Sequence, residues 1–252
     1  MRRHELTDAE WAIIAPLLPN KVRGVARVDD RRVINGILWR FRTGAPWRDV
    51  PERYGRRTTL YNRFVRWRAA RVWDKLLEAV SAAYDGDIVM FDSSCVRVHQ
   101  HGAAIKKGRR QSLHMGRSRG GLTTKIHALV DAEGRPIHLA LTAGQAGDAP
   151  VGRELLARLA PGGILLADKA YDTDAIRAET AQRGAFANVP PRFIRKRTFA
   201  FSPWLYRQRN HIERFFNRIK QMRGLATRYD RRPDNFLAAL KLAAVRIWIK
   251  TL

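Results

Sequence analysis

The chain has 252 residues, and its 48 lysines and arginines outnumber 23 aspartates and glutamates, which gives a formal net charge of +25. A compact protein this basic repels itself unless a polyanion is its usual partner, so we expect a nucleic-acid-binding protein. A single cysteine excludes an internal disulfide, and the lack of an apolar run long enough for a spanning helix or a signal peptide predicts a cytoplasmic, nucleoid-associated protein.

The first part of the chain has the pattern of a small helical domain. Thr7 and Glu10 form a predicted capping box at the start of the first helix. A second apolar face at helical spacing covers residues 29–42, and a longer helix is predicted over residues 57–84. We therefore expect an all-α, helix-turn-helix-like DNA-binding domain over residues 1–84.

The start of the longest of these helices has the composition of a recognition helix. Its apolar face, with Leu60 and Phe64, is expected to pack on a core. The side chains expected to contact base edges and phosphates are Thr59, Asn62, Arg63 and Arg66. The alternative is a basic face that is only solvated; the charge of the whole chain favours DNA.

From residue 85 the pattern changes to that of an α/β domain, predicted over residues 85–252. Residues 87–94 form a buried strand that is expected to end at Asp92, a usual position for a catalytic group. A basic, glycine-rich loop follows and is expected to order on phosphate. Its predicted DNA contacts are Lys106, Lys107, Arg109, Arg110, Arg117 and Arg119.

The middle of this domain alternates strands and helices. Residues 123–131 and 135–144 read as an antiparallel hairpin, and a helix and a second buried strand that ends in Asp168 come next. Asp172 and Asp174 are expected to cap the following helix. A short strand and a basic linker complete the pattern, which predicts a mixed sheet with helices packed on it.

The stretch Tyr206–Met222 is predicted to be one helix with two faces. Its apolar stripe needs a core, and beside it runs a polar ridge at steps of three or four residues. The ridge consists of Tyr206, Arg209, Glu213, Asn217 and Lys220. Glu213 is the single acid on that ridge. A weak surface ion pair with Arg209 is one explanation for it.

A catalytic role is the other explanation, because three acids then belong together. Asp92 and Asp168 end buried strands and Glu213 lies on a helix. Three hard oxygen donors can bind two Mg²⁺ ions together with substrate phosphates. Two such ions would activate a water or a 3′-hydroxyl and stabilise the leaving oxygen at a phosphodiester. Mn²⁺ is a possible substitute.

The same residues resemble the DDE transposases of bacterial insertion sequences. Tyr206, Arg209, Glu213 and Lys220 have the spacing of the family's Y-R-E-K signature. The stretches MFDSS and ADKAYD resemble its other two acid motifs, and LTDAEWAIIAPLLP, GAPWRDVPERYG and GRSRGGLTTKIHALVDAEGRP also resemble family sequence. One departure is Ala170, where the family motif has glycine.

The resemblance implies a ribonuclease H-like catalytic domain and a transposase. Asp92, Asp168 and Glu213 would hold the metal ions, and Tyr206, Arg209 and Lys220 would assist at the DNA ends. The enzyme would bind the terminal repeats of its element, cleave the DNA and join the ends to target DNA, as a homodimer in the DNA complex. Two alternatives are a structure-selective nuclease of the same fold and a non-catalytic DNA-binding regulator. The intact acids argue against the regulator.

Overall fold

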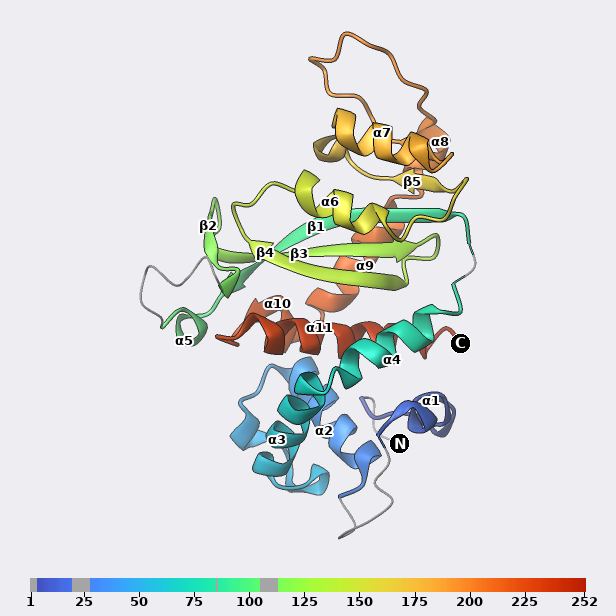
Figure 1. The fold of residues 1–252 in the computed structure, drawn as a ribbon. Helices are drawn as coiled ribbons and strands as arrows, with labels where there is room; N and C mark the ends of the chain where they lie inside the picture. Colours follow the sequence, from blue (N-terminus) through green and yellow to red (C-terminus); the bar gives the residue numbers. More distant parts are fainter. Residues whose placement is uncertain (1–3, 20–27, 85, 105–112) are drawn as a thin grey trace. The chain divides into compact units, whose positions relative to one another are not determined.

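The computed structural model describes residues 4–19, 28–84, 86–104 and 113–252 (Figure 1). It divides into two compact units. Unit 1 comprises Met1–Ala83, His99–Ile105 and Ile219–Leu252, and unit 2 comprises Tyr84–Val98 and Lys106–Arg218. The division of function between residues 1–84 and 85–252 stays a prediction.

A mixed sheet forms the centre of unit 2 (Figure 1). Its strands are β1 (Ile88–Val98), β2 (Gly116–Ser118), β3 (Gly121–Asp131), β4 (Pro136–Ala143), β5 (Ile164–Leu166) and β6 (Phe186–Asn188). β3 pairs antiparallel with β1 on one side and with β4 and the short β2 on the other. β5 pairs parallel with β1, and β6 pairs parallel with β5.

The sheet has the order expected of a ribonuclease H-like domain. Three antiparallel strands, β4, β3 and β1, are followed by two strands parallel to β1. β3 and β4 form the predicted hairpin, and Gly134, at φ 77°, supplies the left-handed residue of its turn. The predicted fold class, a mixed-sheet α/β domain preceded by a helical region, is therefore confirmed.

Helices cover the sheet of unit 2. They are α6 (Ala149–Leu156), α7 (Asp174–Gln182), α8 (Pro203–Arg207) and α9 (Asn210–Lys220), whose last two residues belong to unit 1. Val89 and Phe91 of β1 pack in one apolar core with Leu155 of α6 and Ile176 of α7. Because side chains alternate along a strand, Asp92 is directed to the opposite face, away from this core.

Unit 1 is built from helices. They are α1 (Asp8–Ile14), α2 (Asp30–Thr43), α3 (Arg57–Ala69), α4 (Val72–Ser81), α5 (Gln100–Ala103), α10 (Arg223–Ala226) and α11 (Pro233–Trp248), with a two-residue strand β7 (Thr227–Arg228). The predicted capping box is present at α1, where Thr7 and Glu10 bond each other's backbone N–H groups. Short 3₁₀ turns at Ala15–Leu17, Trp47–Asp49 and Glu52–Tyr54 complete the unit.

The long helix predicted over residues 57–84 is in fact two helices, α3 and α4. The helix is interrupted at Arg71, which has a left-handed backbone at φ 56°. Trp73 folds back on α3: its indole N–H donates to the carbonyl of Phe64 at 3.2 Å, and its ring lies 5.2 Å from that of Trp67. Burying these aromatic surfaces offsets the cost of one strained residue.

The C-terminal helix α11 packs within the same unit as the N-terminal helices. Lys241 donates to Asp74 of α4 at 2.6 Å, and Arg246 forms a buried ion pair with Glu10 of α1. Deleting the N-terminal residues would leave these cations without partners. Point variants are therefore better probes of DNA binding than truncation. Among the described helices, none is both long and apolar enough to cross a membrane.

Candidate active site

Two acidic side chains come just after the point where the parallel strands β1 and β5 stop pairing. β1 and β5 pair with Met90 opposite Leu166, and Asp92 and Asp168 each come two residues later. Side chains two residues apart share a face, and the two carboxylates are close enough for the charge of Asp168 to raise the pKa of Asp92. The prediction that Asp92 ends its strand is wrong, since β1 continues to Val98. What ends before Asp92 is the pairing with β5.

Asp168 also shapes the turn that follows it. Its Oδ1 accepts a hydrogen bond from the backbone N–H of Ala170 at 2.9 Å, at the start of the 3₁₀ turn Lys169–Tyr171. Ala170, the departure from the family motif, is not among the residues with a left-handed backbone. An alanine methyl therefore causes no backbone strain at this position.

Arg209 links two of the three predicted catalytic acids. Its Nη2 donates to Asp92 Oδ2 at 2.6 Å, and its Nη1 donates to Glu213 Oε1 at 2.8 Å. The side chain of Arg209 is 15% exposed, so this is not only the surface ion pair that the spacing allowed. The planar guanidinium brings Glu213 of α9 to the same site as Asp92 of β1.

The backbone around Arg209 differs from the prediction of one continuous helix. Tyr206 lies in α8, and α9 begins at Asn210. At the junction the backbone N–H of Arg209 bonds to the carbonyl of Tyr206, and that of Ile212 bonds to the carbonyl of Arg209. These tighter bonds, three residues apart, interrupt the regular α-helix. The apolar stripe on α9 is buried as predicted.

Burial raises the pKa of Asp92 to about 6. The guanidinium of Arg209 and the N–H of Ser93, which donates to Asp92 Oδ1 at 2.7 Å, lower the pKa but do not offset this effect. The neighbouring charge of Asp168 raises it further. Burial alone would lower the pKa of Arg209, but Asp92 and the other nearby acids raise it, so the guanidinium stays charged.

The raised pKa of Asp92 predicts a pH dependence of folding. The folded protein binds this proton more tightly than the unfolded chain, so ionising Asp92 destabilises the fold. The loss develops between about pH 4 and pH 6 and amounts to about 3 kcal/mol of unfolding free energy. Asp92→Asn removes the titrating group. Its stability relative to wild type should therefore rise by that amount from pH 4 to pH 7.

Urea unfolding followed by circular dichroism, in the presence of a chelator, measures this difference. The matched control is Glu154→Gln, which changes an exposed carboxylate on α6. Its stability difference from wild type should stay constant across the same pH range. A constant difference for Asp92→Asn as well would contradict a raised pKa at Asp92.

A second polar cluster supports Asp92 from the other face of β1. The hydroxyl of Ser93 donates to Asp148 Oδ1 at 2.7 Å, and Lys125 Nζ donates to the same oxygen at 2.9 Å. Ser93 is thus held at its side chain while its N–H holds Asp92. No sequence pattern indicates this role, because an acid just before a helix suggests a cap. Asp148 makes no side-chain cap bond to α6.

The donor set at the site fits a divalent metal ion. Carboxylate oxygens are the ligands that Mg²⁺ and Mn²⁺ prefer, and Asp92 and the neighbouring Asp168 carry such oxygens. Within the described part of the chain, no group of three His, Cys, Asp or Glu side chains is close enough to hold a metal ion. The guanidinium of Arg209 bonds the oxygens of Asp92 and Glu213 instead, so an ion that uses all three acids must displace it.

The other members of the predicted signature lie on the same segment. The ring of Tyr206 lies 5.8 Å from the guanidinium carbon of Arg209. Lys220 is exposed and is the last residue of α9, seven residues after Glu213. Seven residues are two helical turns, so Lys220 and Glu213 share a face of the helix.

The predicted DNA contacts divide into several groups. On α3, Asn62 and Arg66 are exposed and Thr59 is half-buried. Arg63 is buried: it forms an ion pair with Asp30 and stacks on Trp67, so it is not available to DNA. Arg63 lies one helical turn before the exposed Arg66, yet its side chain faces the core. The spacing of the basic residues did not predict this difference. The remaining predicted contacts comprise the exposed Arg117 and Arg119, and Lys106, Lys107, Arg109 and Arg110, which lie outside the described residues.

Two family models match this chain, and together they cover most of it. The model described as "Transposase DDE domain" matches residues 83–248. The model described as "Putative transposase of IS4/5 family" matches residues 6–77. The second match falls on α1 to α4 and the first on the sheet with the candidate site.

Two curated relatives are named after insertion sequence elements. A Brucella ovis protein named "Putative transposase for insertion sequence element IS6501" is 37% identical over 130 residues, which are 51% of this chain and all of that protein. A Burkholderia cepacia protein of insertion element IS402 is 37% identical over 90 residues, 32% of this chain and 61% of that protein. Among solved structures, the Mos1 mariner paired-end complex with Mn is 14% identical at a TM-score of 0.32, with 91% of this chain and 80% of that chain covered. A similarity this low does not contribute to the assignment.

Proposed function

The chain belongs to the transposase DDE domain family, and from this we propose that it is the transposase of an insertion sequence. In the proposed reaction it binds the terminal repeats of its element, cleaves the DNA there and joins the ends to target DNA. The observation that supports this most strongly is the position of Asp92 and Asp168, each two residues beyond the last pair of the parallel strands β1 and β5, with Glu213 linked to Asp92 through one guanidinium.

We propose that Asp92, Asp168 and Glu213 hold divalent metal ions, with Mg²⁺ the expected ion. Bound there, such ions would activate the attacking water or 3′-hydroxyl and stabilise the leaving oxygen. Asp92 must be ionised to act as a ligand, so the N–H of Ser93 and the Asp148 that holds Ser93 would orient its carboxylate. Ion binding should weaken below about pH 6, where Asp92 keeps its proton.

The cations of the site are proposed to act on the DNA rather than on the metal. A guanidinium released from Asp92 and Glu213 can hold a phosphate beside the scissile bond with two parallel hydrogen bonds. Lys220 supplies a point charge on the same face of α9 as Glu213. Tyr206, next to Arg209, is proposed to contact the same DNA end.

Recognition of the terminal repeats is proposed for residues 1–84. The face of α3 with the exposed Asn62 and Arg66 and the half-buried Thr59 suits a helix in a major groove. Arg66→Ala should weaken binding of the element's ends, because it removes a cation without removing a buried contact. In the complex, two copies of the chain are proposed to hold the two ends.

The experiment that tests this function is to incubate the purified protein with duplex DNA carrying the ends of its own element. With Mg²⁺ present, we expect cleavage at the ends and joining of the 3′ ends to a second DNA; with a chelator, binding alone. Cleavage without joining would identify a nuclease instead. Binding without cleavage in either Mg²⁺ or Mn²⁺ would identify a regulator.

A further inference from the structure

A tight turn in unit 2 presents two apolar side chains to solvent. The N–H of Arg195 bonds to the carbonyl of Arg192 at 3.0 Å, so Phe193 and Ile194 occupy the two central positions of a four-residue turn. Phe193 is 98% exposed and Ile194 is 68% exposed. The chain thus displays a phenylalanine ring almost as fully as an unfolded peptide would.

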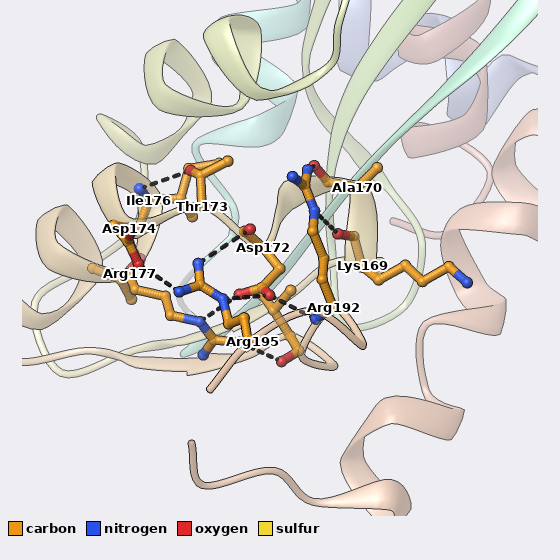
Figure 2. A network of polar contacts seen from close by, with 11 residues as sticks. Lys169, Ala170, Asp172, Thr173, Asp174, Ile176, Arg177, Arg192 and Arg195 are labelled. Atoms are coloured by element: carbon orange, nitrogen blue, oxygen red, sulfur yellow. Dashed lines mark hydrogen bonds and ion pairs between the residues drawn. The ribbon is translucent and has the colours of Figure 1, made fainter. Parts of the chain in front are cut away.

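A buried carboxylate holds both ends of this turn. The side chain of Asp172 is inaccessible, and its Oδ2 accepts from the backbone N–H of Arg192 at 2.7 Å and from Arg195 Nε at 2.6 Å. Its Oδ1 accepts from Arg177 Nε at 2.7 Å. Figure 2 shows these side chains converging on Asp172. The prediction that Asp172 caps α7 is therefore wrong; Thr173 is the cap, bonded to the N–H of Ile176.

Further contacts fix the turn against the segment that carries Asp168. Arg192 donates to the carbonyls of Lys169 and Ala170, at 3.1 and 2.7 Å (Figure 2). On the other side, the ring of Phe199 lies 4.0 Å from the guanidinium carbon of Arg177 and 5.2 Å from that of Arg195. Burial alone would raise the pKa of Asp172, but these cations and the N–H of Arg192 lower it, so the anchor stays charged at neutral pH.

The residues around the two apolar side chains indicate the partner. Residues 192–197 include four cations, which are Arg192, Arg195, Lys196 and Arg197. Residues 190–200 contain no acid. A protein partner would have to supply several acids to match these cations, because a charge buried in an interface without a counter-charge is costly. DNA presents both matching surfaces, since its phosphates attract the cations and its bases stack on apolar rings.

We propose that Phe193 and Ile194 are an apolar wedge that enters between base pairs of bound DNA, while Lys196 and Arg197 contact the flanking phosphates. This rests on the proposed function, because it assumes that DNA is the substrate. Asp172 is the positioning residue, because it fixes the turn to the segment after Asp168. The wedge would therefore enter the DNA at a fixed distance from the proposed catalytic carboxylates.

Duplexes of the element's end that carry 2-aminopurine at successive positions test the wedge. Its fluorescence rises when the base is unstacked. We expect the wild-type protein to raise it severalfold at one or two adjacent positions. Phe193→Ala should lose this signal and weaken binding about tenfold. Phe193→Leu should keep part of it. Thr198→Ala, an exposed neighbour without apolar bulk, is the matched control and should behave as wild type.

A second pair of variants tests the anchor. Asp172→Asn leaves Phe193 in the chain but removes the charge that holds Arg192 and Arg195, so the fluorescence change should fall and spread over more positions. Asp174→Asn is the control, since Asp174 is exposed and bonds only Arg195 among the turn residues. Circular dichroism of each variant excludes unfolding as the cause.

The outcomes separate the wedge from the function itself. If wild-type protein binds and cleaves the DNA with no change in 2-aminopurine fluorescence, or if Phe193→Ala keeps the signal, the wedge is overturned and the function stands. If Phe193→Ala leaves the fluorescence signal unchanged and alters only the molar mass of the protein measured by light scattering, the turn contacts a second copy of the chain. Wild-type protein that binds no DNA overturns both proposals.

Discussion

Replacing Asp92, Asp168 or Glu213 by alanine is expected to abolish strand cleavage while DNA binding stays close to that of wild type. Each change removes a proposed metal ligand and no phosphate contact. Altering only the hydrogen-bond partners of a metal ligand costs about 10–100-fold, so loss of the ligand itself should exceed about a hundredfold. Binding can even tighten, because each variant removes a negative charge that repels DNA.

Cleavage of end-labelled duplex and gel-shift affinity, measured on the same preparations, check this expectation. Glu154→Ala is the matched control: it removes an exposed carboxylate of unit 2 that lies on α6. It should leave cleavage unchanged. Wild-type cleavage by any one of the three variants would remove that residue from the proposed metal site and leave the other two assignments intact.

Arg209 is expected to give the second large effect, and its two readouts should move in opposite directions. Its guanidinium bonds oxygens of Asp92 and Glu213, so a divalent ion that takes those oxygens competes with it. Arg209→Gln should therefore tighten ion binding by about tenfold. This is near the lower limit of what a charge-assisted hydrogen bond contributes, because Glu213 is half exposed and its bond to Arg209 is weakened by solvent. Joining of DNA ends should fall, because the phosphate clamp is lost.

Arg209→Lys distinguishes this arrangement from a surface ion pair. A lysine keeps the charge but cannot bridge two carboxylates with a planar fork, so joining should be impaired. Lys220→Ala is the companion variant: it should weaken end positioning and joining while ion affinity stays at the wild-type value. Calorimetric titration with Mn²⁺ and a strand-transfer assay separate the two effects. Wild-type joining by both variants would reduce this segment to an amphipathic helix with a surface salt bridge.

The sequence by itself determined most of the regular elements and the identity of the acids. Helical periodicity identified α2 and the buried stripe of α9, alternation identified the hairpin of β3 and β4, and the side chains of Thr7 and Glu10 located the start of α1. These features depend on residues within a turn or a hairpin of one another. A local pattern is enough to predict them, because the interactions that create them are local.

Breaks inside helices depended on contacts that the pattern does not contain. The periodicity of residues 57–84 continues through Arg71, and only the packing of Trp73 on Phe64 and Trp67 accounts for the change of direction there. In the same way, the periodicity from Tyr206 onward does not show that the helix is interrupted before Asn210. A periodic sequence fixes which face is apolar, but tertiary packing decides whether the axis stays straight.

The roles of individual charged residues were decided by the tertiary structure alone. Arg209 bonds Asp92 across 117 positions of sequence, which no spacing rule reports. Arg63 faces Asp30 in a core rather than solvent, and Asp172 anchors a turn twenty residues away instead of capping its own helix. The physical reason is that a charge becomes buried only where a distant partner compensates its desolvation. The sequence therefore identifies the charged groups, and the fold determines which of them contact one another and which stay available to bind DNA or metal.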